Sequence, residues 1–206
     1  PDFVKSLLDN QPEKATSLLF GLKSTYPIVV TRDIELAKSW LRLKARGNER
    51  FGLIASSGAS RLRPSVINIK AKIDPSNWFL NGKNDVRSSY FLEDVATEFD
   101  IQGLELDWVC VGWDGNFCYT PSGWKYRKFS GTKWQNIGDQ ARQLYLKNSY
   151  RVLLTRARQG MVIFVPNGDS SDDTRDKSFY DPTFSYLRRI GVPELSSHRV
   201  SINSLG

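Results

Sequence analysis

The chain has 206 residues, enough to bury one sizeable core, and its 40% hydrophobic and 25% charged residues are typical of a globular domain. Its 29 Lys and Arg outnumber 22 Asp and Glu, so the net charge is +7, which favours polyanionic partners such as nucleic acid or nucleotides. The charge is equally consistent with a basic protein that binds neither.

The cysteine and histidine counts narrow the function classes. Cys110 and Cys118 are too few for a disulfide framework and are not spaced as a CxxC motif, which favours a reducing, cytoplasmic setting. His198 is the single histidine, so a Ser-His-Asp triad, a Cys-His pair and a histidine-rich zinc site each lack parts. Because the parts of a histidine-rich zinc site are missing, we predict no metal site. No apolar run approaches the roughly 18 residues of a membrane span, so we also predict no membrane segment.

The first predicted elements lie between residues 27 and 57. Val29 and Val30 belong to a short buried strand, and Thr31 or Asp33 can cap a helix that continues to residue 45, because its apolar residues recur at helical spacing. A second strand is predicted over residues 51–57, before a basic turn. Strand, helix and strand in this order favour a parallel α/β unit.

The centre of the chain alternates loops and strands. Residues 74–91 contain turn dipeptides and are predicted to be mostly loop, with a helical turn near Trp78. Two strands follow, in "LEDVATEFD" and in "LDWVCVGW", with Gly103 in the loop between them. Because α/β proteins place ligand-contacting groups on loops at the carboxyl ends of their strands, we expect this loop to lie at that edge of the sheet.

Residues 113–137 are rich in glycine, aromatic and basic residues and are predicted to form a β-hairpin insertion. Strand alternation places Trp124, Tyr126 and Lys128 on one face, where the rings can stack on bases and the cation can hold a phosphate. In the alternative arrangement, which we favour for the aromatics, the rings cover the edge of the hydrophobic core.

The last predicted elements begin with Asp139, which can cap a helix that ends at Gly160 and is followed by the strand "MVIFVP". Residues 167–180 are predicted to be a flexible acidic loop, whose spacing of carboxylates fits no EF-hand. A final helix is predicted from near Pro182 to Gly191, and residues 196–206 are expected to be a loosely held tail.

Two segments far apart in the chain resemble motifs of one enzyme family. In superfamily 1 helicases, motif V reads Thr-x-His-x-x-(Lys or Gln)-Gly-x-Glu, and "TEFDIQGLE" matches it at Thr97, Gln102, Gly103 and Glu105. Motif VI reads Tyr-Val-Ala-x-Thr-Arg-Ala, and "YRVLLTRA" is similar to it, with Arg151 as a basic residue where the family keeps an apolar one. The matching residues of motif VI are Tyr150, Val152, Thr155, Arg156 and Ala157. The wider pattern looks most like the Schlafen group 3 DNA/RNA helicases.

The resemblance implies a fold and an activity. The implied fold is a RecA-like α/β domain of the P-loop NTPase type over residues 1–195, with a mostly parallel sheet and helices on both faces. The implied function is the second motor domain of an ATP-dependent helicase or translocase that moves along single-stranded DNA or RNA.

The resemblance also assigns roles to the matched residues. Arg156 becomes the catalytic arginine finger at the γ-phosphate. Gln102, Gly103 and Glu105 become nucleotide-binding residues, with Glu105 accepting hydrogen bonds from the ribose, while Thr97 contacts a nucleic-acid phosphate. We expect Gly103 to be required because a Cβ would obstruct the turn, and we expect Arg156 and Glu105 to converge at the carboxyl edge of the sheet.

Two basic positions have alternative interpretations. Arg61 or Arg63 is a candidate for a second nucleotide-sensing arginine, and the alternative is a solvated basic loop. Arg158 is expected to be a solvated charge or a salt-bridge partner rather than a catalytic group.

The sequence departs from the helicase pattern in two respects. Phe99 replaces the usual histidine of motif V, and no GxxxxGK[ST] phosphate-binding loop is present. ATP and Mg²⁺ are therefore expected to be bound mainly by an upstream RecA-like domain of the same polypeptide, and the 206 residues alone should not hydrolyse ATP. The alternative function is a non-catalytic module, derived from a helicase domain, that binds nucleic acid or protein.

Overall fold

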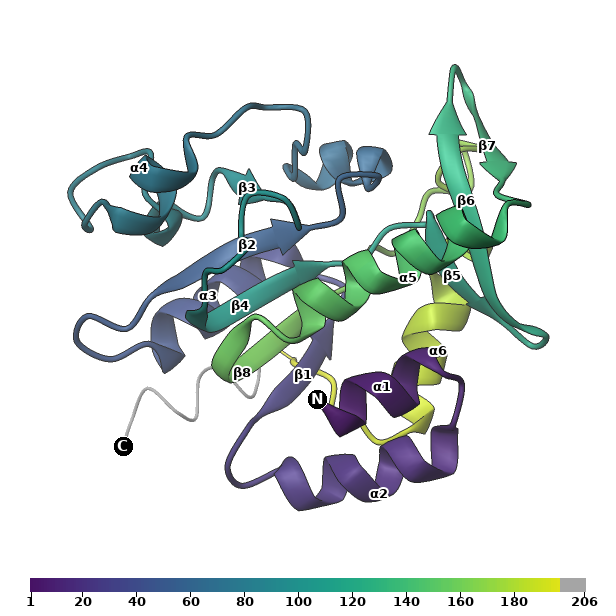
Figure 1. The fold of residues 1–206 in the computed structure, drawn as a ribbon, viewed down its shortest axis with the longest axis horizontal. Coiled ribbons are helices and arrows are strands. Elements are labelled where there is room, and N and C mark those ends of the chain that lie inside the picture. The colour runs from purple at the N-terminus through teal and green to yellow at the C-terminus, as the bar shows by residue number, and fades with distance from the viewer. Residues whose placement is uncertain (197–206) are drawn as a thin grey trace.

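The computed structural model describes residues 1–196, whereas residues 197–206, which include His198 and nearly all of the predicted tail, lie outside the described residues. A five-stranded sheet with strand order β1-β8-β4-β2-β3 forms its centre, and all neighbouring strands are parallel (Figure 1). The strands are β1 (Ile28–Thr31), β8 (Ala157–Phe164), β4 (Leu106–Gly112), β2 (Phe51–Ala55) and β3 (Val95–Ala96).

Helices cover both faces of this sheet, as the resemblance to helicase motor domains implies. Helix α3 (Ile34–Lys44) packs on one face, where Trp40 and Leu41 meet Cys110 and Val162. The other face is covered by α1 (Asp2–Leu8), α2 (Pro12–Leu22), α5 (Gln140–Leu154) and α6 (Asp181–Arg189). Alternate residues of the central strands face the two layers, which explains why β4 and the second half of β8 are apolar along nearly their whole length.

The beginning of the sheet follows the sequence prediction closely. Strand β1 contains Val29 and Val30, and the Asp33 carboxylate caps α3 by accepting hydrogen bonds from the backbone N–H groups of Glu35 and Leu36. The helical turn predicted near Trp78 is α4 (Pro75–Leu80). Helices α1 and α2, by contrast, were not expected from the sequence.

The boundary between α5 and β8 differs from the prediction. The helix was expected to continue to Gly160, but it ends at Leu154, where the Thr155 hydroxyl donates back to the carbonyl oxygen of Arg151. Gly160 instead lies within β8, where an added Cβ would be 2.6 Å from the carbonyl oxygen of Pro27 and 2.7 Å from the Trp108 ring. Glycine is needed here for close packing and not as a helix cap.

The predicted hairpin insertion is a three-stranded antiparallel sheet rather than a single hairpin. It consists of β5 (Phe117–Thr120), β6 (Gly123–Ser130) and β7 (Lys133–Asn136), and it stands at one end of the molecule (Figure 1). Strands β5 and β6 pair antiparallel across a short turn at residues 121–122, with Thr120 opposite Gly123.

The acidic loop 167–180 has defined partners for its carboxylates. Asp172 accepts a hydrogen bond from the Thr174 hydroxyl and pairs with Arg61 and Arg175, and the hydrogen bonds from Thr174 and Arg175 lower the pKa of Asp172. Asp169 also pairs with Arg175, at 2.9 Å. Flexibility of this loop stays a prediction, but its charges are directed at neighbouring arginines. Within residues 1–196 every helix is too short or too polar to cross a bilayer.

Candidate functional sites at the two sheet edges

Arg156 and Glu105 lie side by side at the amino edge of the sheet. They directly precede β8 and β4, which are parallel and begin in register, with Leu106 opposite Ala157. The Leu106 N–H donates to the Arg156 carbonyl oxygen at 3.1 Å, and Arg156 Nη1 reaches the Leu104 carbonyl oxygen at 3.5 Å. The two residues are therefore neighbours through their backbones, but the predicted edge was wrong, because both segments finish where a strand begins.

The side chains at this amino edge are only loosely engaged. Glu105 lies 3.6 Å from Arg158 Nε, and the two side chains are 61% and 63% exposed, a geometry in which an ion pair contributes little to stability. Arg158 is thus a salt-bridge partner, as expected. The Nε atom of Arg156 is buried and has no hydrogen-bond partner among the described residues.

The turn before β4 explains the glycine of motif V. Gly103 has a φ of +74°, in the left-handed region that glycine adopts without strain, but no atom lies within 4 Å of the position of an added Cβ. The backbone conformation, and not the expected steric obstruction, therefore favours glycine. Gln102 beside it is exposed.

Arg61 and Arg63 lie at the opposite, carboxyl edge, on the 3-10 turn Ser60–Ser65 that follows β2. The seven residues of β4 separate the two edges by about 20 Å. Arg61 donates to Asp172 at 2.9 Å and lies over the Phe129 ring. The structure therefore does not bring Arg61 or Arg63 together with Arg156 and Glu105.

The residues after β3 are held tightly at the carboxyl edge. Thr97 is 9% exposed, and its hydroxyl donates to the Asp100 carboxylate at 2.7 Å, so the group predicted to contact phosphate already has a partner. Glu98, which the sequence did not indicate, is 6% exposed and accepts hydrogen bonds from the Ser57 N–H, the Ser57 hydroxyl and the Ser149 hydroxyl. Glu98 therefore connects the segment after β3 with the turn after β2, through Ser57, and with helix α5, through Ser149.

A buried carboxylate also follows β4. Burial raises the pKa of Asp114 to about 6, although hydrogen bonds from the Gly115 and Arg61 backbones and from the Tyr180 hydroxyl oppose the shift. These three donors occupy the carboxylate and keep it inside the protein. Among the described residues, no cluster of His, Cys, Asp and Glu has the arrangement of a metal site.

An open cleft of about 620 Å³ lies above this edge, between the turn after β2, strand β6 and helix α5. We call it the basic cleft, and its lining includes Ser57, Lys70, Glu98, Lys128, Phe129 and Arg142. Lys128, which the sequence predicts to contact nucleic acid, lines this cleft, and the contact itself stays a prediction. The volume of the cleft is within the range of clefts that bind small ligands.

Trp124 and Tyr126 are oriented differently from Lys128. The Trp124 ring stacks on Phe117, with centroids 4.4 Å apart, and Tyr126 packs on the same ring at 5.3 Å. Both side chains are part of the hydrophobic core's outer layer. Stacking of bases on these two rings stays a prediction, and their packing favours the alternative role as a cover for the core.

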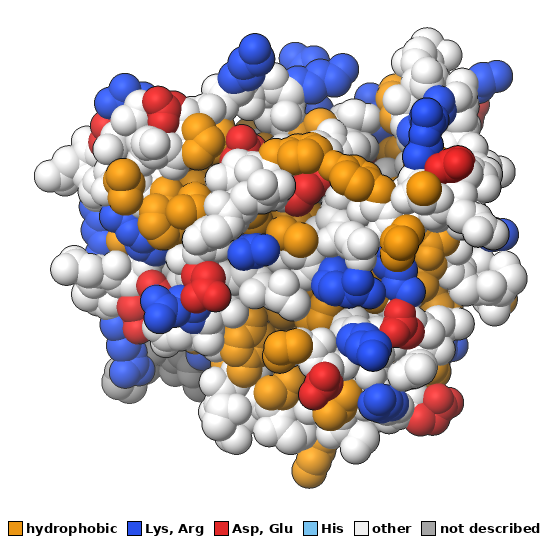
Figure 2. Space-filling model, viewed as in Figure 1, with side chains coloured by type: hydrophobic (Ala, Val, Ile, Leu, Met, Phe, Trp, Pro, Cys, Tyr) orange, Lys and Arg blue, Asp and Glu red, His pale blue; other side chains and the backbone are white. Residues whose placement is uncertain are grey.

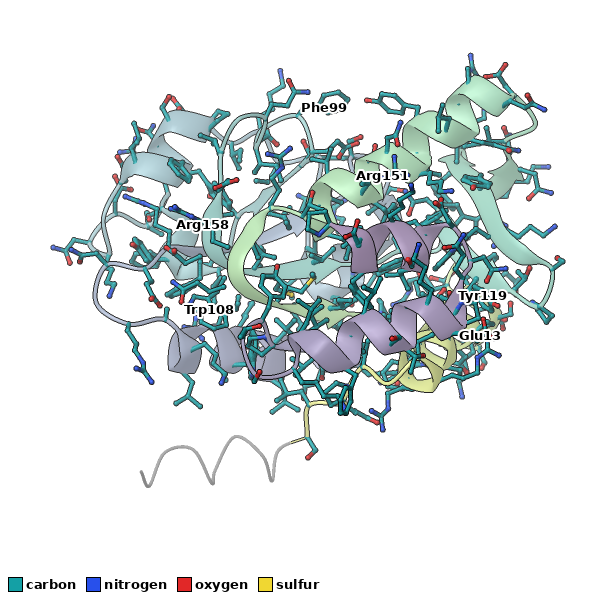
Figure 3. All side chains as sticks on the ribbon, turned by 60° about the horizontal axis from the view of Figure 1, so that its bottom comes forward. Glu13, Phe99, Trp108, Tyr119, Arg151 and Arg158 are labelled. Carbon is teal, nitrogen blue, oxygen red and sulfur yellow. The ribbon has the colours of Figure 1, made fainter. Side chains whose placement is uncertain are left out.

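Residues 97–105 and helix α5 together connect the two edges. The connection begins at the carboxyl edge with Phe99 against Tyr145 and Glu98 against Ser149. It ends at the amino edge with Leu104 against Arg156. Figure 3 shows Phe99 on the outer surface beyond α5, well apart from Arg158 and Trp108.

A comparison with known families decides the relationship of the chain. A family model for the Schlafen group 3, DNA/RNA helicase domain matches residues 1–167. The chain belongs to this family. No curated protein and no solved structure matches the chain. This Schlafen group 3 domain is a helicase-derived α/β domain with a parallel five-stranded sheet.

Proposed function

We propose that this Schlafen group 3 domain is the second, RecA-like motor domain of an ATP-dependent helicase or translocase. The observation that carries the proposal is the juxtaposition of Arg156 and Glu105 at the amino edge of the sheet, through the register of β4 and β8. The family match and the parallel sheet with helices on both faces support the same assignment.

The residues at the amino edge fit the ribose and phosphate groups of ATP. Arg156 is partly exposed, and among the described residues its Nη1 makes one long contact, 3.5 Å to the Leu104 carbonyl oxygen, so the outer N–H groups of its guanidinium can donate to a phosphate. Glu105 is exposed, and its one ion pair within residues 1–196 is the weak contact with Arg158, so it can exchange that partner for ribose hydroxyls. Bound ATP would supply the free energy of hydrolysis, while Arg156 stabilises charge on the transferred phosphoryl group.

The phosphate-binding loop and the ligands of Mg²⁺ belong to another domain in this proposal. The one Gly-Lys step of the chain, at Gly82 and Lys83, is followed by Asn84 and has no glycine at the required upstream position. We propose that an upstream RecA-like domain of the same polypeptide contributes these groups. The present domain then contributes the arginine from across the shared site.

The segment 97–105 and α5 supply a physical connection between ATP and nucleic acid. One end of this pair of segments carries Arg156, and the other end lies beside the basic cleft. We propose that single-stranded nucleic acid binds at the carboxyl edge while ATP binds at the amino edge. A shift of either ligand would then be transmitted to the other site through residues 97–105 and α5.

Substitution of Arg156 tests the proposal in the polypeptide that contains both domains. We expect Arg156→Ala to lower ATP turnover by about 10³-fold or more, because an arginine finger stabilises charge that develops during the reaction. ATP binding should remain mostly intact, as measured with a fluorescent nucleotide. Arg158→Ala is the matched control, since Arg158 is exposed at the same edge, and its turnover should stay within about threefold of the unchanged protein.

Unchanged turnover in Arg156→Ala would remove the arginine-finger assignment. Absence of ATP turnover in the unsubstituted two-domain protein, combined with binding of nucleic acid, would support the alternative of a non-catalytic binding module. The departure of Phe99 from the motif V histidine is the observation that favours this second candidate.

A further inference from the structure

We infer that Phe99 and Tyr145 form a base-stacking platform that makes the basic cleft selective for single-stranded nucleic acid. The inference deepens the proposed function and rests on the proposal that single-stranded nucleic acid binds at the carboxyl edge. It does not depend on the role of Arg156. It transfers the stacking role from Trp124 and Tyr126 to a pair of rings that the sequence did not bring together.

The two rings are available to a ligand in a way that the other aromatics near the cleft are not. Phe99 and Tyr145 are each 53% exposed, and their centroids lie 6.4 Å apart with an angle of 32° between the planes. Tyr145 also lines the basic cleft. Trp124, by contrast, is covered by the stack on Phe117. Two large exposed rings beside each other leave apolar surface in water, which a planar base can cover.

Three of the four cations that line the cleft are available to hold phosphates. Lys70, Lys128 and Arg142 line the cleft, are exposed, and form no ion pair within residues 1–196. Arg127 also lines it, but its guanidinium donates to the Cys118 sulfur and lies over the Phe179 ring. Figure 2 shows Lys and Arg side chains beside hydrophobic side chains along the upper part of this face.

The single carboxylate in the lining does not oppose an anion strongly. Glu98 is 6% exposed, and its two oxygens accept hydrogen bonds from Ser57 and Ser149. Its charge is therefore directed at protein donors rather than at the open cleft. The remaining charged residues that line the described cleft are basic, so a phosphate backbone matches its charge.

Unpaired bases are the ligand groups that fit the rings. In a duplex each base is already stacked on its neighbours, so its faces are not available to Phe99 and Tyr145. Every base has an aromatic face, which predicts binding without strong sequence preference. The combination of exposed rings with cations that have no ion pair within residues 1–196 therefore favours single-stranded DNA or RNA over duplex of the same sequence.

Binding of labelled oligonucleotides to the 206-residue chain tests the inference. The probes are fluorescein-labelled oligothymidylate and oligouridylate of about 12 nucleotides, within the site sizes of single-strand binders, and an abasic strand with the same number of phosphates. We expect Phe99→Ala and Tyr145→Ala each to weaken binding of the thymidylate and uridylate strands by about tenfold. The abasic strand should bind more weakly to the unsubstituted chain and should not distinguish it from either variant.

The matched controls separate stacking from general surface effects. Leu144→Ala removes a side chain that is 56% exposed, next to Tyr145 on α5 but outside the cleft lining, and Phe20→Ala removes one that is 76% exposed on α2. Both should bind thymidylate as the unsubstituted chain does. Lys128→Gln should reduce the slope of log K against log salt by about 1, whereas Lys133→Gln on β7 should leave it unchanged.

Each outcome decides the inference. Equal binding of thymidylate by the unsubstituted chain and by Phe99→Ala and Tyr145→Ala would overturn it, as would equal affinity for duplex and single strand or no binding of any strand. These results are independent of ATP turnover, so failure of the platform and failure of the Arg156 assignment are distinguishable. Melting temperatures should change little, because both rings are exposed and surface substitutions usually alter stability by less than about 0.5 kcal/mol.

Discussion

At the amino edge of the sheet the charged side chains stand in solvent, whereas at the carboxyl edge the carboxylates are enclosed by protein. Glu105 is 61% exposed and 3.6 Å from its partner, while Glu98 is 6% exposed and accepts three hydrogen bonds. Both belong to the same connection, residues 97–105. Loosely held charges can change partners when a ligand arrives, and enclosed charges keep the shape of a site, so the two edges are suited to different tasks.

The largest predicted effect on stability is at the enclosed end of this connection. Glu98→Ala leaves the Ser57 N–H and the Ser57 hydroxyl without their acceptor and removes the link to the Ser149 hydroxyl, which keeps the Tyr145 carbonyl oxygen as an acceptor. We expect this change to lower the free energy of unfolding by about 3 kcal/mol. Urea denaturation measures the change. A loss below about 1 kcal/mol would show that Glu98 does not join the strand layer to α5.

The second prediction concerns the pH dependence that Asp114 adds at the carboxyl edge. The pKa of this carboxyl is raised from 3.8 to about 6 by burial, so between these values the folded chain keeps a proton that the unfolded chain has released. Its contribution to stability is therefore fully present below the unfolded pKa and is lost as the pH rises through about 6. The difference amounts to roughly 2 to 3 kcal/mol for a group buried this deeply.

Asp114→Asn removes this titration and provides the measurement. The free energy of unfolding of the unsubstituted chain, minus that of Asp114→Asn, should fall between about pH 4 and about pH 7. A difference that stays constant, or that rises with pH, would contradict the assignment. Asp139→Asn is the control, because Asp139 is an exposed helix cap with no such burial.

A third, smaller effect is expected at the turn on the amino edge. Gly103→Ala places a Cβ in open space but at a φ of +74°, so we expect a loss of about 1 kcal/mol from the backbone alone. Gly21→Ala, inside α2 and without nearby atoms, should change stability in the opposite direction by about 0.5 to 1 kcal/mol. Equal effects of the two substitutions would show that the turn is not fixed as described.

The smallest predicted effect completes the comparison of the two edges. Glu105→Ala should change the free energy of unfolding by less than about 0.5 kcal/mol, because its pair with Arg158 is exposed and long. Urea denaturation of Glu105→Ala and Glu98→Ala side by side gives the contrast directly. A large loss for Glu105→Ala would mean that the amino edge is structural and would weaken the case for a ligand there.

Local pattern explains the parts of the fold that the sequence predicted. Val29 and Val30 belong to a strand, Asp33 caps the next helix, and the motif residues Glu105 and Arg156 meet at one edge. The strand and the cap depend on residues that are close in sequence. The meeting of Glu105 and Arg156 follows because their two motifs precede strands that pair with each other. The edge itself was predicted wrongly, because a motif between two strands can lie at the end of the first or at the start of the second.

Contacts between distant residues account for what the sequence did not reveal. Arg61 pairs with Asp172, which is 111 positions away, so neither residue alone indicates that the arginine is engaged. Phe99 follows β3, and Tyr145 lies on α5, so only the three-dimensional structure shows that their rings are adjacent. The local pattern around Gly160 indicates a helix end, whereas its position against Pro27 and Trp108 depends on the register of β8 with β4.

Helix α5 has a mechanical consequence for any ligand at either end. With 15 residues it is a stiff rod about 22 Å long, and the buried side chains of Leu146, Tyr150, Leu153 and Leu154 fix it from its middle to its C-terminal end. The part of the helix before Leu146, which ends with Tyr145, has no buried side chain. A ligand on the aromatic pair therefore meets the boundary between the free and the anchored halves of the rod, and the guanidinium of Arg156 lies just past the anchored end.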